Sequence, residues 1–437
     1  MTRAMQDSGI EWIGEFPQEW RTCKLKHIVA TKITDGPHTT PQLLDDGIPF
    51  VSAESIKGNK VNLDLKRGYI SIEDHKLFCE KCKPQRNDIF MVKSGATTGA
   101  IGLVETDEEF SIWSPLALIR CREKDFVQKY VFYSMLCDSF RKQVELFWNY
   151  GTQQNIGMSV IENLIVAIPE RVEQQLIADY LDKKCAEIDT VIASKQKGNE
   201  LLKEQRQSII YEAVTKGLDK NAPLRASGIE WIGDIPAGWE TSKVKRFYDI
   251  VLGKMLQPNQ KDDSDELLDY MCSINITWGG INTKTVKQMW FSQKEKDQYK
   301  LNNGDLLVVE GGDVGISCLW NDELEECYLQ NAVHRVRSKE GYSNRHLYYW
   351  LYALKSIGYI DLICNKATIA HFTKDKFGEI PYIVCRLDEQ NAIADYLDCM
   401  CADIDQLMQA NNTTIEKLKE YRQSVIYEAV TGKAEIN

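Results

Sequence analysis

No stretch of the sequence approaches the roughly 20 consecutive apolar residues that a membrane-spanning helix needs. The first residues, MTRAMQDSGIEW, also lack the apolar core of a secretory signal. The chain has 13 cysteines, an odd number, scattered without the spacing of a disulfide framework. These features predict a soluble, cytoplasmic protein whose cysteines are reduced.

Motifs for nucleotide chemistry and nucleophilic catalysis are missing as well. No Gly-x4-Gly-Lys-Ser/Thr phosphate loop is present, and the glycine-rich Gly311–Gly315 is more simply a turn. None of the 11 prolines is followed by Pro or Asp, as in the Pro-Pro pair of amino-methyltransferases or the Pro-Asp start of many nuclease sites. The six histidines form no Ser-His-Asp pattern. The sequence therefore predicts a protein that is not an enzyme and has no catalytic residues.

Basic excess and a complete set of metal ligands are also lacking. The formal net charge is -11, and no basic domain stands out, so DNA binding would depend on a few placed side chains and on a partner protein. His75, Cys79 and Cys82 could form half of a zinc site, but a structural zinc needs four ligands and no second pair is evident. We predict no metal site and no cofactor in this chain.

What the sequence does contain is a repeat with a variable filling. SGIEWIG occurs at Ser8–Gly14 and again at Ser227–Gly233, and Glu173–Thr215 recurs at Glu389–Thr431 with 25 of 43 positions identical. Between these anchors lie two stretches, 21–172 and 240–388, that agree only in scattered places. Repeated segments around sequences that differ suggest two copies of one kind of domain that bind two different targets.

The repeated segments have the pattern of long helices. Apolar and polar residues at a 4-3 spacing fall at Ile188, Ile192, Lys195, Asn199, Leu202, Arg206, Ile209 and Ala213, and in the second copy at Ile404, Met408, Asn411, Ile415, Leu418, Arg422, Val425 and Ala429. This heptad pattern predicts two helices packed as an antiparallel coiled coil with pseudo-two-fold symmetry, each about 60 Å long. Such a rod would hold the two variable domains apart. The alternative is a pair of ordinary amphipathic core helices.

The near-identity of the two copies suggests that something outside the chain binds both. Exposed positions of unrelated core helices would have diverged, whereas the copies retain YEAVT and a Gln-Ser pair. We therefore predict two equivalent docking sites for a partner subunit. The candidate partner-binding residues are Trp12, Trp231, Arg206, Arg422, Tyr211 and Tyr427.

Each variable filling combines strands and helices. Strands are predicted at 48–56, 88–95 and 116–121, and at 270–276, 305–312 and 334–338; helices are predicted at 129–147 and 345–357. The fold class is therefore mixed α+β, with two domains of similar fold separated by the long helices. The predicted domains are 1–172, a spacer helix at 173–222, a second domain at 223–388 and a second spacer helix at 389–437.

The order of these features resembles the specificity subunit of type I restriction-modification systems. The resemblance rests on Asp35–Pro41 (DGPHTTP), on GIPFV from Gly47, on Gly-Thr-Gln-Gln-Asn-Ile from Gly151, and on the two EQ..IADYLD helix starts, and it covers nearly the whole chain. The second domain departs from the pattern, with Val251–Lys254 and Lys366–Ile369 at the corresponding places.

The resemblance implies a non-catalytic subunit that recognises DNA. Each target-recognition domain would read one half of a split, asymmetric DNA sequence, and the helices would set the number of unread base pairs between the halves. The partners implied are two modification subunits, which methylate adenine, and restriction subunits. S-adenosylmethionine, ATP and Mg²⁺ would belong to those partners.

Candidate DNA-binding residues are loop side chains that can donate to or accept from base edges, as Gln or Asn does with adenine and Arg or Lys with guanine. In the first domain they are His38, Thr39, Thr40, Lys93, Ser94, Thr97, Gln153, Gln154 and Asn155; in the second they are Lys254, Gln257, Asn259, Asn275, Trp278, Asn365, Lys366 and Thr368.

Two other functions stay open at this point. One is a protein-interaction scaffold in which the coiled-coil spacer joins two protein-binding domains. The other is an intrinsic nuclease or methyltransferase, which would have to modify DNA as the purified chain alone. Selection from randomised duplex DNA separates the scaffold from a DNA reader.

Overall fold

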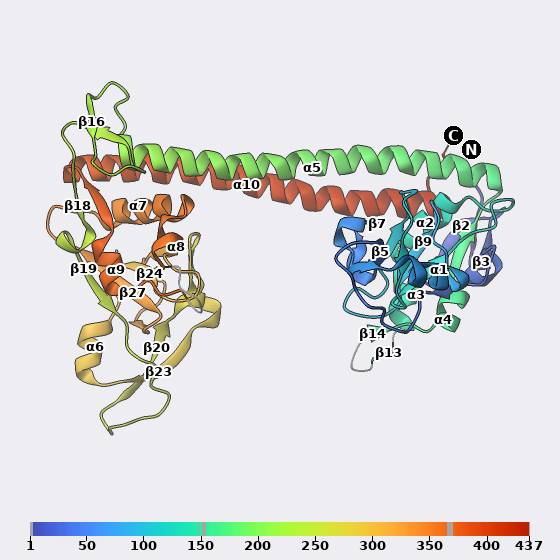
Figure 1. Ribbon diagram of the computed structural model, residues 1–437, viewed down its shortest axis with the longest axis horizontal. Coiled ribbons are helices and arrows are strands. Elements are labelled where there is room, and N and C mark those ends of the chain that lie inside the picture. The colour runs from blue at the N-terminus through green and yellow to red at the C-terminus, as the bar shows by residue number, and fades with distance from the viewer. Residues whose placement is uncertain (1–2, 148, 151–153, 365–369, 437) are drawn as a thin grey trace. The chain divides into compact units, whose positions relative to one another are not determined.

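The computed structural model describes residues 3–147, 149–150, 154–364 and 370–436. The chain forms two compact units, unit 1 with residues 1–195 and 412–437, and unit 2 with residues 196–411 (Figure 1). Two long helices, α5 (Arg171–Lys216) and α10 (Leu387–Val430), each contribute one part to unit 1 and the other part to unit 2.

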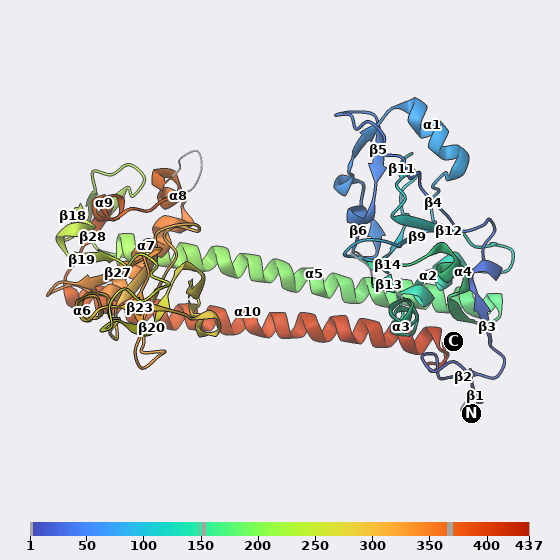
Figure 2. The same ribbon diagram turned by 90° about the horizontal axis from the view of Figure 1, so that it is seen from below.

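Unit 1 is built on a six-stranded sheet of order β4-β12-β9-β10-β7-β6. Its strands are β4 (Thr34–Asp35), β12 (Leu116–Ile119), β9 (Ile89–Val92), β10 (Ile101–Leu103), β7 (Lys60–Val61) and β6 (Ile56–Lys57). A three-stranded sheet holds β11 (Ser111–Ile112), β5 (Ile48–Val51) and β8 (Gly68–Ile70). The other strands form two-stranded pairs: β1 (Met5–Asp7) with β2 (Glu15–Pro17), β3 (Arg21–Lys24) with β15 (Ile165–Ile168), and β13 (Asn149–Tyr150) with β14 (Gln154–Asn155). The helices are α1 (Ile72–Lys81), α2 (Gln128–Leu136), α3 (Asp138–Leu146) and α4 (Met158–Asn163). Figure 2 shows α1 and β5 at the end of this unit that lies away from α5.

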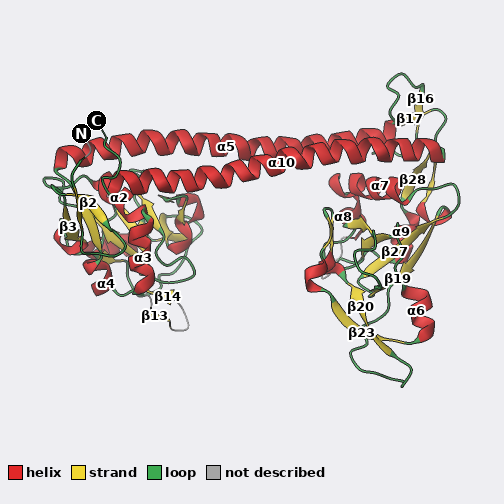
Figure 3. Cartoon of the chain, turned by 180° about the vertical axis from the view of Figure 1, so that it is seen from behind, coloured by secondary structure: helices red, strands yellow, loops and turns green. Residues whose placement is uncertain are grey.

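Unit 2 repeats this plan with a four-stranded sheet of order β19-β27-β24-β25. These strands are β19 (Tyr248–Leu252), β27 (Val333–Ser338), β24 (Leu306–Val309) and β25 (Ser317–Leu319). The smaller sheets are β23 (Lys287–Phe291), β20 (Glu266–Met271) and β26 (Tyr328–Leu329); β16 (Leu224–Ala226) with β17 (Asp234–Pro236); β18 (Glu240–Lys243) with β28 (Pro381–Val384); and β21 (Ile276–Thr277) with β22 (Gly280–Ile281). The helices are α6 (Gln293–Tyr299), α7 (Asn344–Ser356), α8 (Tyr359–Cys364) and α9 (Lys374–Glu379), and Figure 3 shows α7 between the sheet and α10.

The predicted mixed α+β class is confirmed, and a strand forms most of five of the six predicted ranges or begins or ends within them. The range 270–276 is wrong as one strand, because Tyr270–Met271 end β20 and Ser273–Asn275 form a 3-10 helix. Strands β9 and β24 are continuous apolar runs, IFMV and LLVV, in which every residue is buried, as expected for central strands covered on both faces. The helix predicted over 129–147 is instead two helices, α2 and α3. Cys137 between them has extended dihedrals (φ -68°, ψ 144°), which end one helix and start the next.

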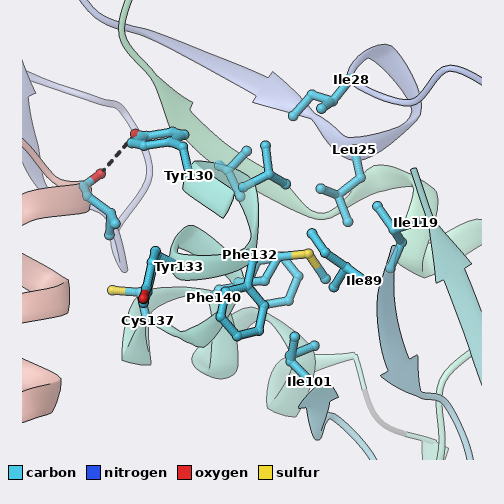
Figure 4. Close-up of a cluster of buried hydrophobic side chains, with 14 of the residues drawn as sticks. Leu25, Ile28, Ile89, Ile101, Ile119, Tyr130, Phe132, Tyr133, Cys137 and Phe140 are labelled. Carbon is cyan, nitrogen blue, oxygen red and sulfur yellow. Dashed lines mark hydrogen bonds between the residues drawn. The ribbon is translucent and has the colours of Figure 1, made fainter. Parts of the chain in front are cut away.

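The core of unit 1 lies between α2 and α3 on one side and the main sheet on the other. Figure 4 shows Phe132 and Phe140 from the helices facing Ile89, Ile101 and Ile119 from the strands. The same cluster includes residues from both long helices, such as those of α10 between Val425 and Val430, together with the SGIEWIG segment. The second SGIEWIG segment joins the core of unit 2 in the same way. Each SGIEWIG segment therefore packs into the hydrophobic core of its own unit.

The identical helix starts hold the variable domains by identical contacts. In unit 1 the Tyr133 hydroxyl donates to Asp182 at 2.8 Å, and in unit 2 Tyr349 donates to Asp398. Lys129 and Arg345 form ion pairs with the same two carboxylates. The buried Gln174 and Gln390 accept the first backbone N–H groups of the helical region at 2.9 and 3.0 Å. Part of the identity between the copies therefore reflects packing inside each unit.

The predicted heptad seam is confirmed, since all of its positions in both helices are buried or half-buried while their neighbours are largely exposed. Within unit 2, Asn411 donates to Asn199 at 2.9 Å and Arg206 pairs with Asp405. The residue number therefore rises along α5 while that of its partner falls along α10. That is antiparallel pairing. Within unit 1, Arg422 and Asp189 repeat the ion pair at 3.1 Å.

Candidate DNA interface

In unit 1 the loops that follow β4 and β9 meet at a buried carboxylate, Asp35. This residue is 6% exposed, and its carboxylate contacts Lys81 Nζ at 2.6 Å, Lys93 Nζ at 2.8 Å and the His38 ring at 3.3 Å. Burial raises the pKa of Asp35, but the hydrogen bonds from Lys81 and Lys93 outweigh it and hold the pKa below its usual value. Asp35 therefore fixes the positions of two predicted DNA-binding residues, Lys93 and His38.

Replacing Asp35 by Asn should destabilise the protein by about 2 kcal/mol at pH 7, because two lysines lose their charged acceptor in a buried place. The folded pKa lies below the unfolded value of about 4, so the advantage of the wild type is complete above about pH 5 and disappears as the pH falls through the folded pKa. Urea unfolding at several pH values measures this difference.

The matched control is Asp107→Asn. Asp107 also pairs with a cation, Arg86 at 2.7 Å, but its side chain is 77% exposed, and such surface pairs contribute little. Equal losses for the two variants would contradict the bracing role of Asp35.

The second loop of unit 1 brings more of the predicted residues together. The backbone N–H of Gly95 donates to the Gln154 carbonyl at 3.1 Å, and Ser94 forms a β-bridge with Asn155. The Thr98 hydroxyl donates to the carbonyls of Gly95 and Gln154, at 2.8 and 3.1 Å. The candidates Lys93, Ser94, Thr97, Gln154 and Asn155 thus share one surface beside the exposed His38, Thr39 and Thr40. Gln153 lies outside the described residues.

In unit 2 the loop after β19 takes the place of the loop after β4. A Cβ on Gly253 would lie 2.3 Å from the Gln330 carbonyl oxygen, and one on Gly36 would lie 2.0 Å from that of Ile112, so both loops need glycine at this crossing. The candidates that follow Gly253 are divided between the interior and the surface. Lys254 and Gln257 are buried, whereas Asn259 is exposed.

The buried side chains of this loop bond to one another. Lys254 Nζ donates to the Gln257 amide oxygen at 2.9 Å and to Glu295, and the Gln257 amide donates to Asp265 at 3.0 Å. Lys254 and Gln257 therefore brace the loop from inside. What the loop presents outward, besides Asn259, is Met255, which is 75% exposed, and its neighbour Leu256.

The remaining candidates of unit 2 lie elsewhere. Asn275 is fully buried, and its amide donates to the Asn282 carbonyl at 2.9 Å. The Trp278 ring packs against Tyr348 and Tyr352 of α7, with ring centroids 5.7 and 4.8 Å away. Both residues stabilise the region around the β21–β22 hairpin. Asn365, Lys366 and Thr368 lie outside the described residues.

The predicted partner-binding residues make contacts within their own units. Arg206 and Arg422 form the ion pairs of the seam, and the Tyr211 hydroxyl donates to the Trp231 carbonyl at 2.8 Å. Tyr427 accepts a hydrogen bond from Lys433, while Trp12 and Trp231 are half-buried. Trp231 also packs on Tyr359, with ring centroids 4.5 Å apart.

Another set of residues on the long helices is both identical in the two copies and exposed; the sequence pointed to the segments 204–208 and 420–424 and to YEAVT, but not to the first two residues of each set. On α5 they are Glu200, Lys203, Glu204, Ser208 and Glu212, and on α10 they are Glu416, Lys419, Glu420, Ser424 and Glu428. We call these two sets the acidic faces, one in each unit. Their spacing of three and four residues places each set on one side of its helix. A comparison of the solvent exposure of each position with its identity in the two copies separates these residues from the seam.

Among the described residues, no group of three or more His, Cys, Asp and Glu side chains is arranged to hold a metal ion. His75 contacts the Ser111 hydroxyl at 2.9 Å and lies 3.6 Å from the Cys79 sulfur. Burial raises the pKa of the Cys82 thiol to about 12.

A protein-family model described as "Type I restriction modification DNA specificity domain" matches residues 17–202 and 236–417. The chain belongs to this family. Its two matches make it a two-domain specificity protein, which recognises DNA and is a non-catalytic component of its system.

Relatives of similar length support this membership. The "Type I restriction enzyme MjaVIII specificity subunit" of Methanocaldococcus jannaschii is 22% identical over 435 residues, covering 96% of this chain and 94% of the relative. The "Type I restriction enzyme EcoBI specificity subunit" of Escherichia coli is 22% identical and covers 76% of this chain and 73% of the relative.

Two solved structures share the fold of this specificity protein. One is titled "Structural basis underlying complex assembly and conformational transition of the type I R-M system"; it has a TM-score of 0.72 and 15% identity, over 96% of this chain and 99% of that one. The other is the HsdS subunit from Thermoanaerobacter tengcongensis, with a TM-score of 0.51 and 16% identity, over 96% of this chain and 98% of that one. Within the described part of the chain, no helix is long and apolar enough to cross a membrane.

Proposed function

We propose that unit 1 and unit 2 each read one half of a split, asymmetric DNA site. The observation that carries this proposal is the shared loop frame with different side chains. Gly36 and Gly253 occupy the same tight crossing, but the first is followed by Pro-His-Thr-Thr and the second by Lys-Met-Leu-Gln. Equivalent loops that present different side chains outward, His38, Thr39 and Thr40 in one and Met255 and Leu256 in the other, suit two different half-sites.

The readers in this proposal are the exposed members of the predicted set. In unit 1 they are His38, Thr39, Thr40, Thr97 and Asn155, supported by Lys93, Ser94 and Gln154. In unit 2, of the candidates that the structure describes, the exposed member is Asn259; Gln153, Asn365, Lys366 and Thr368 stay candidates. Lys254, Gln257, Asn275 and Trp278 would act by holding the loops. Catalysis would come from modification subunits with S-adenosylmethionine and from restriction subunits with ATP and Mg²⁺. Because the target is DNA, we expect the complex in the cytoplasm.

Selection from randomised duplex DNA, with the full chain bound to its modification partner, tests this function. The expected result is an enriched motif of two short blocks separated by a constant number of unselected base pairs. If no motif is enriched, the proposal that this chain recognises a DNA sequence is wrong. A single continuous block would contradict one half-site per unit.

We further propose that the acidic faces dock two modification subunits, one face in each unit. Each face carries three glutamates and one lysine, so its partner should present a basic surface. Identical exposed residues in both units would let the same partner surface bind twice.

Reversing the charge at Glu204 and Glu420 together should weaken binding of the modification subunit about 10- to 100-fold, because like charges then face each other across the interface. Either single change should leave one intact face, so the complex should hold one tightly bound modification subunit instead of two. Mass photometry across a titration measures both the stoichiometry and the affinity.

The matched control reverses two other exposed glutamates, Glu108 in unit 1 and Glu325 in unit 2, for the same change in net charge. Two modification subunits bound with unchanged affinity to the Glu204→Lys, Glu420→Lys protein would show that docking lies elsewhere.

A further inference from the structure

The residue that follows the central strand has the same backbone position in both units but the opposite charge. Lys93 follows β9 and Glu310 follows β24. The carbonyl of Lys93 accepts from the Ile156 N–H, and that of Glu310 from the Phe372 N–H, each at 2.8 Å. The next residue forms a bridge in each case, Ser94 with Asn155 and Gly311 with His371.

Each of these charged side chains is mostly buried and paired. The Lys93 side chain is 14% exposed and lies 2.8 Å from Asp35. The Glu310 side chain is 13% exposed, and its two carboxylate oxygens lie 3.1 and 3.2 Å from Nδ1 of His371. A buried charge needs such a partner. In unit 2, unlike unit 1, the partner is itself a side chain of the bridging strand.

His371 is placed to reach outward from this pair. Its side chain is 54% exposed, its backbone carbonyl accepts from Lys376 at 3.0 Å, and its ring lies beside Gly311, 3.8 Å from where a Cβ would be. Among the described residues, the Nε2 atom has no hydrogen-bond partner. With a proton on each ring nitrogen, Nδ1–H donates to Glu310 and Nε2–H is left as a second donor on this exposed side chain.

We infer that Glu310 and His371 together read one C·G base pair in the half-site of unit 2. In the major groove this pair presents the cytosine N4 amine, a donor, beside the guanine O6 and N7, both acceptors. A Glu310 oxygen accepts from the amine and His371 Nε2–H donates to guanine. This inference rests on the proposed function, because it names the base pair that one unit reads.

The equivalent place in unit 1 has a different chemistry. The exposed Asn155 offers an amide, which suits adenine, whereas the mostly buried Lys93 is paired with Asp35 and supports the loop. The residue after β9 is a lysine, and the Asp35 carboxylate beside it is 6% exposed and bonded to Lys81 and Lys93. The two units therefore differ at this place as two unlike half-sites require.

The test repeats the duplex selection with Glu310→Gln and His371→Asn, each in the full chain with the modification partner. The wild type should select C·G over the other base pairs at one position of one half-site by roughly 10- to 100-fold. Each variant should lower that ratio about tenfold, and His371→Asn should shift it toward A·T. The half-site of unit 1, read in the same selection, is the internal control.

Lys374→Ala supplies the matched control. Lys374 is exposed and lies three residues after His371, so a general loss of positive charge should lower affinity without changing any base preference. Thermal unfolding of each variant checks that the fold is retained.

The outcomes separate the two proposals. If the wild type selects no split motif, the proposed function is wrong, and this inference falls with it. If the split motif is present but both variants leave every position unchanged, this inference alone is wrong. Loss of the whole half-site in both variants, at unchanged thermal unfolding, also overturns the reading of a single base pair.

Discussion

Exchange of residues 21–170 for the corresponding filling of another family member is expected to replace one half of the recognised site and leave the other half intact. The two ends of the exchanged segment lie side by side, because its first strand β3 pairs antiparallel with its last strand β15. Arg21 lies opposite Ile168, and Lys24 lies opposite Ile165. The core of the exchanged segment also contacts the SGIEWIG segment, the end of α10 and the start of α5, which are parts of the repeated frame. A foreign filling with the equivalents of Lys129 and Tyr133 should dock on Asp182 in the same way.

The expected effect is large because mismatches accumulate. Each mismatched base pair costs about 1–3 kcal/mol, so three in one half-site change preference by roughly 100-fold to more than 10⁶-fold. Duplex selection with the exchanged protein measures this. The reciprocal exchange of 240–384, closed by the pairing of Glu240 with Val384, is the control. Changes in both half-sites after either exchange would contradict separate reading by the two units.

Removal of one heptad from each long helix is expected to shorten the unread stretch by about three base pairs without altering either half-site. The antiparallel contacts have a constant register, since 189 pairs with 422 and 206 with 405, both summing to 611. Residues 194–200 and 411–417 are opposite each other in that register. Deleting both preserves the heptad seam and removes about 10 Å of helix, close to three steps of 3.4 Å along DNA.

Binding to duplexes with a series of spacings measures the outcome. The optimum should move by about three base pairs, with affinity for the original spacing reduced by orders of magnitude. Deleting 194–200 alone should abolish binding to every spacing, because the two helices then differ in length. Replacing 194–198 by other heptad residues, with Asn199 and Glu200 kept, should leave the optimum spacing unchanged. If the optimum spacing is unchanged after the double deletion, the length of the helices does not set the number of unread base pairs.

The sequence predicted the helices better than the loops, for a physical reason. A heptad repeat is local, so Ile188 to Ala213 could be assigned to a seam without knowledge of distant residues. The roles of Lys254 and Gln257 depend on Glu295 and Asp265, which lie on other segments of the chain. Loop position suggested exposure, and only the fold reveals that these two are buried.

The same reasoning explains why identity alone does not assign a role to each residue of the helices. Identity between the copies predicts an external partner, which stays a prediction, but Asp182 and Asp398 are identical for another reason as well, because each holds its own domain. Burial divides the identical residues into seam, domain contact and acidic face. His371 escaped notice because nothing near it in sequence indicates Glu310, 61 residues earlier.

The core of unit 1 includes Val425, Ile426, Ala429 and Val430 from α10, whereas unit 2 is one continuous stretch, 196–411. On the ribosome, the first domain to be translated therefore waits with part of its apolar surface uncovered until the far end of α10 emerges. The second domain, made later, can finish folding earlier. A nascent chain of this kind is exposed to chaperones and proteases mainly through its oldest residues.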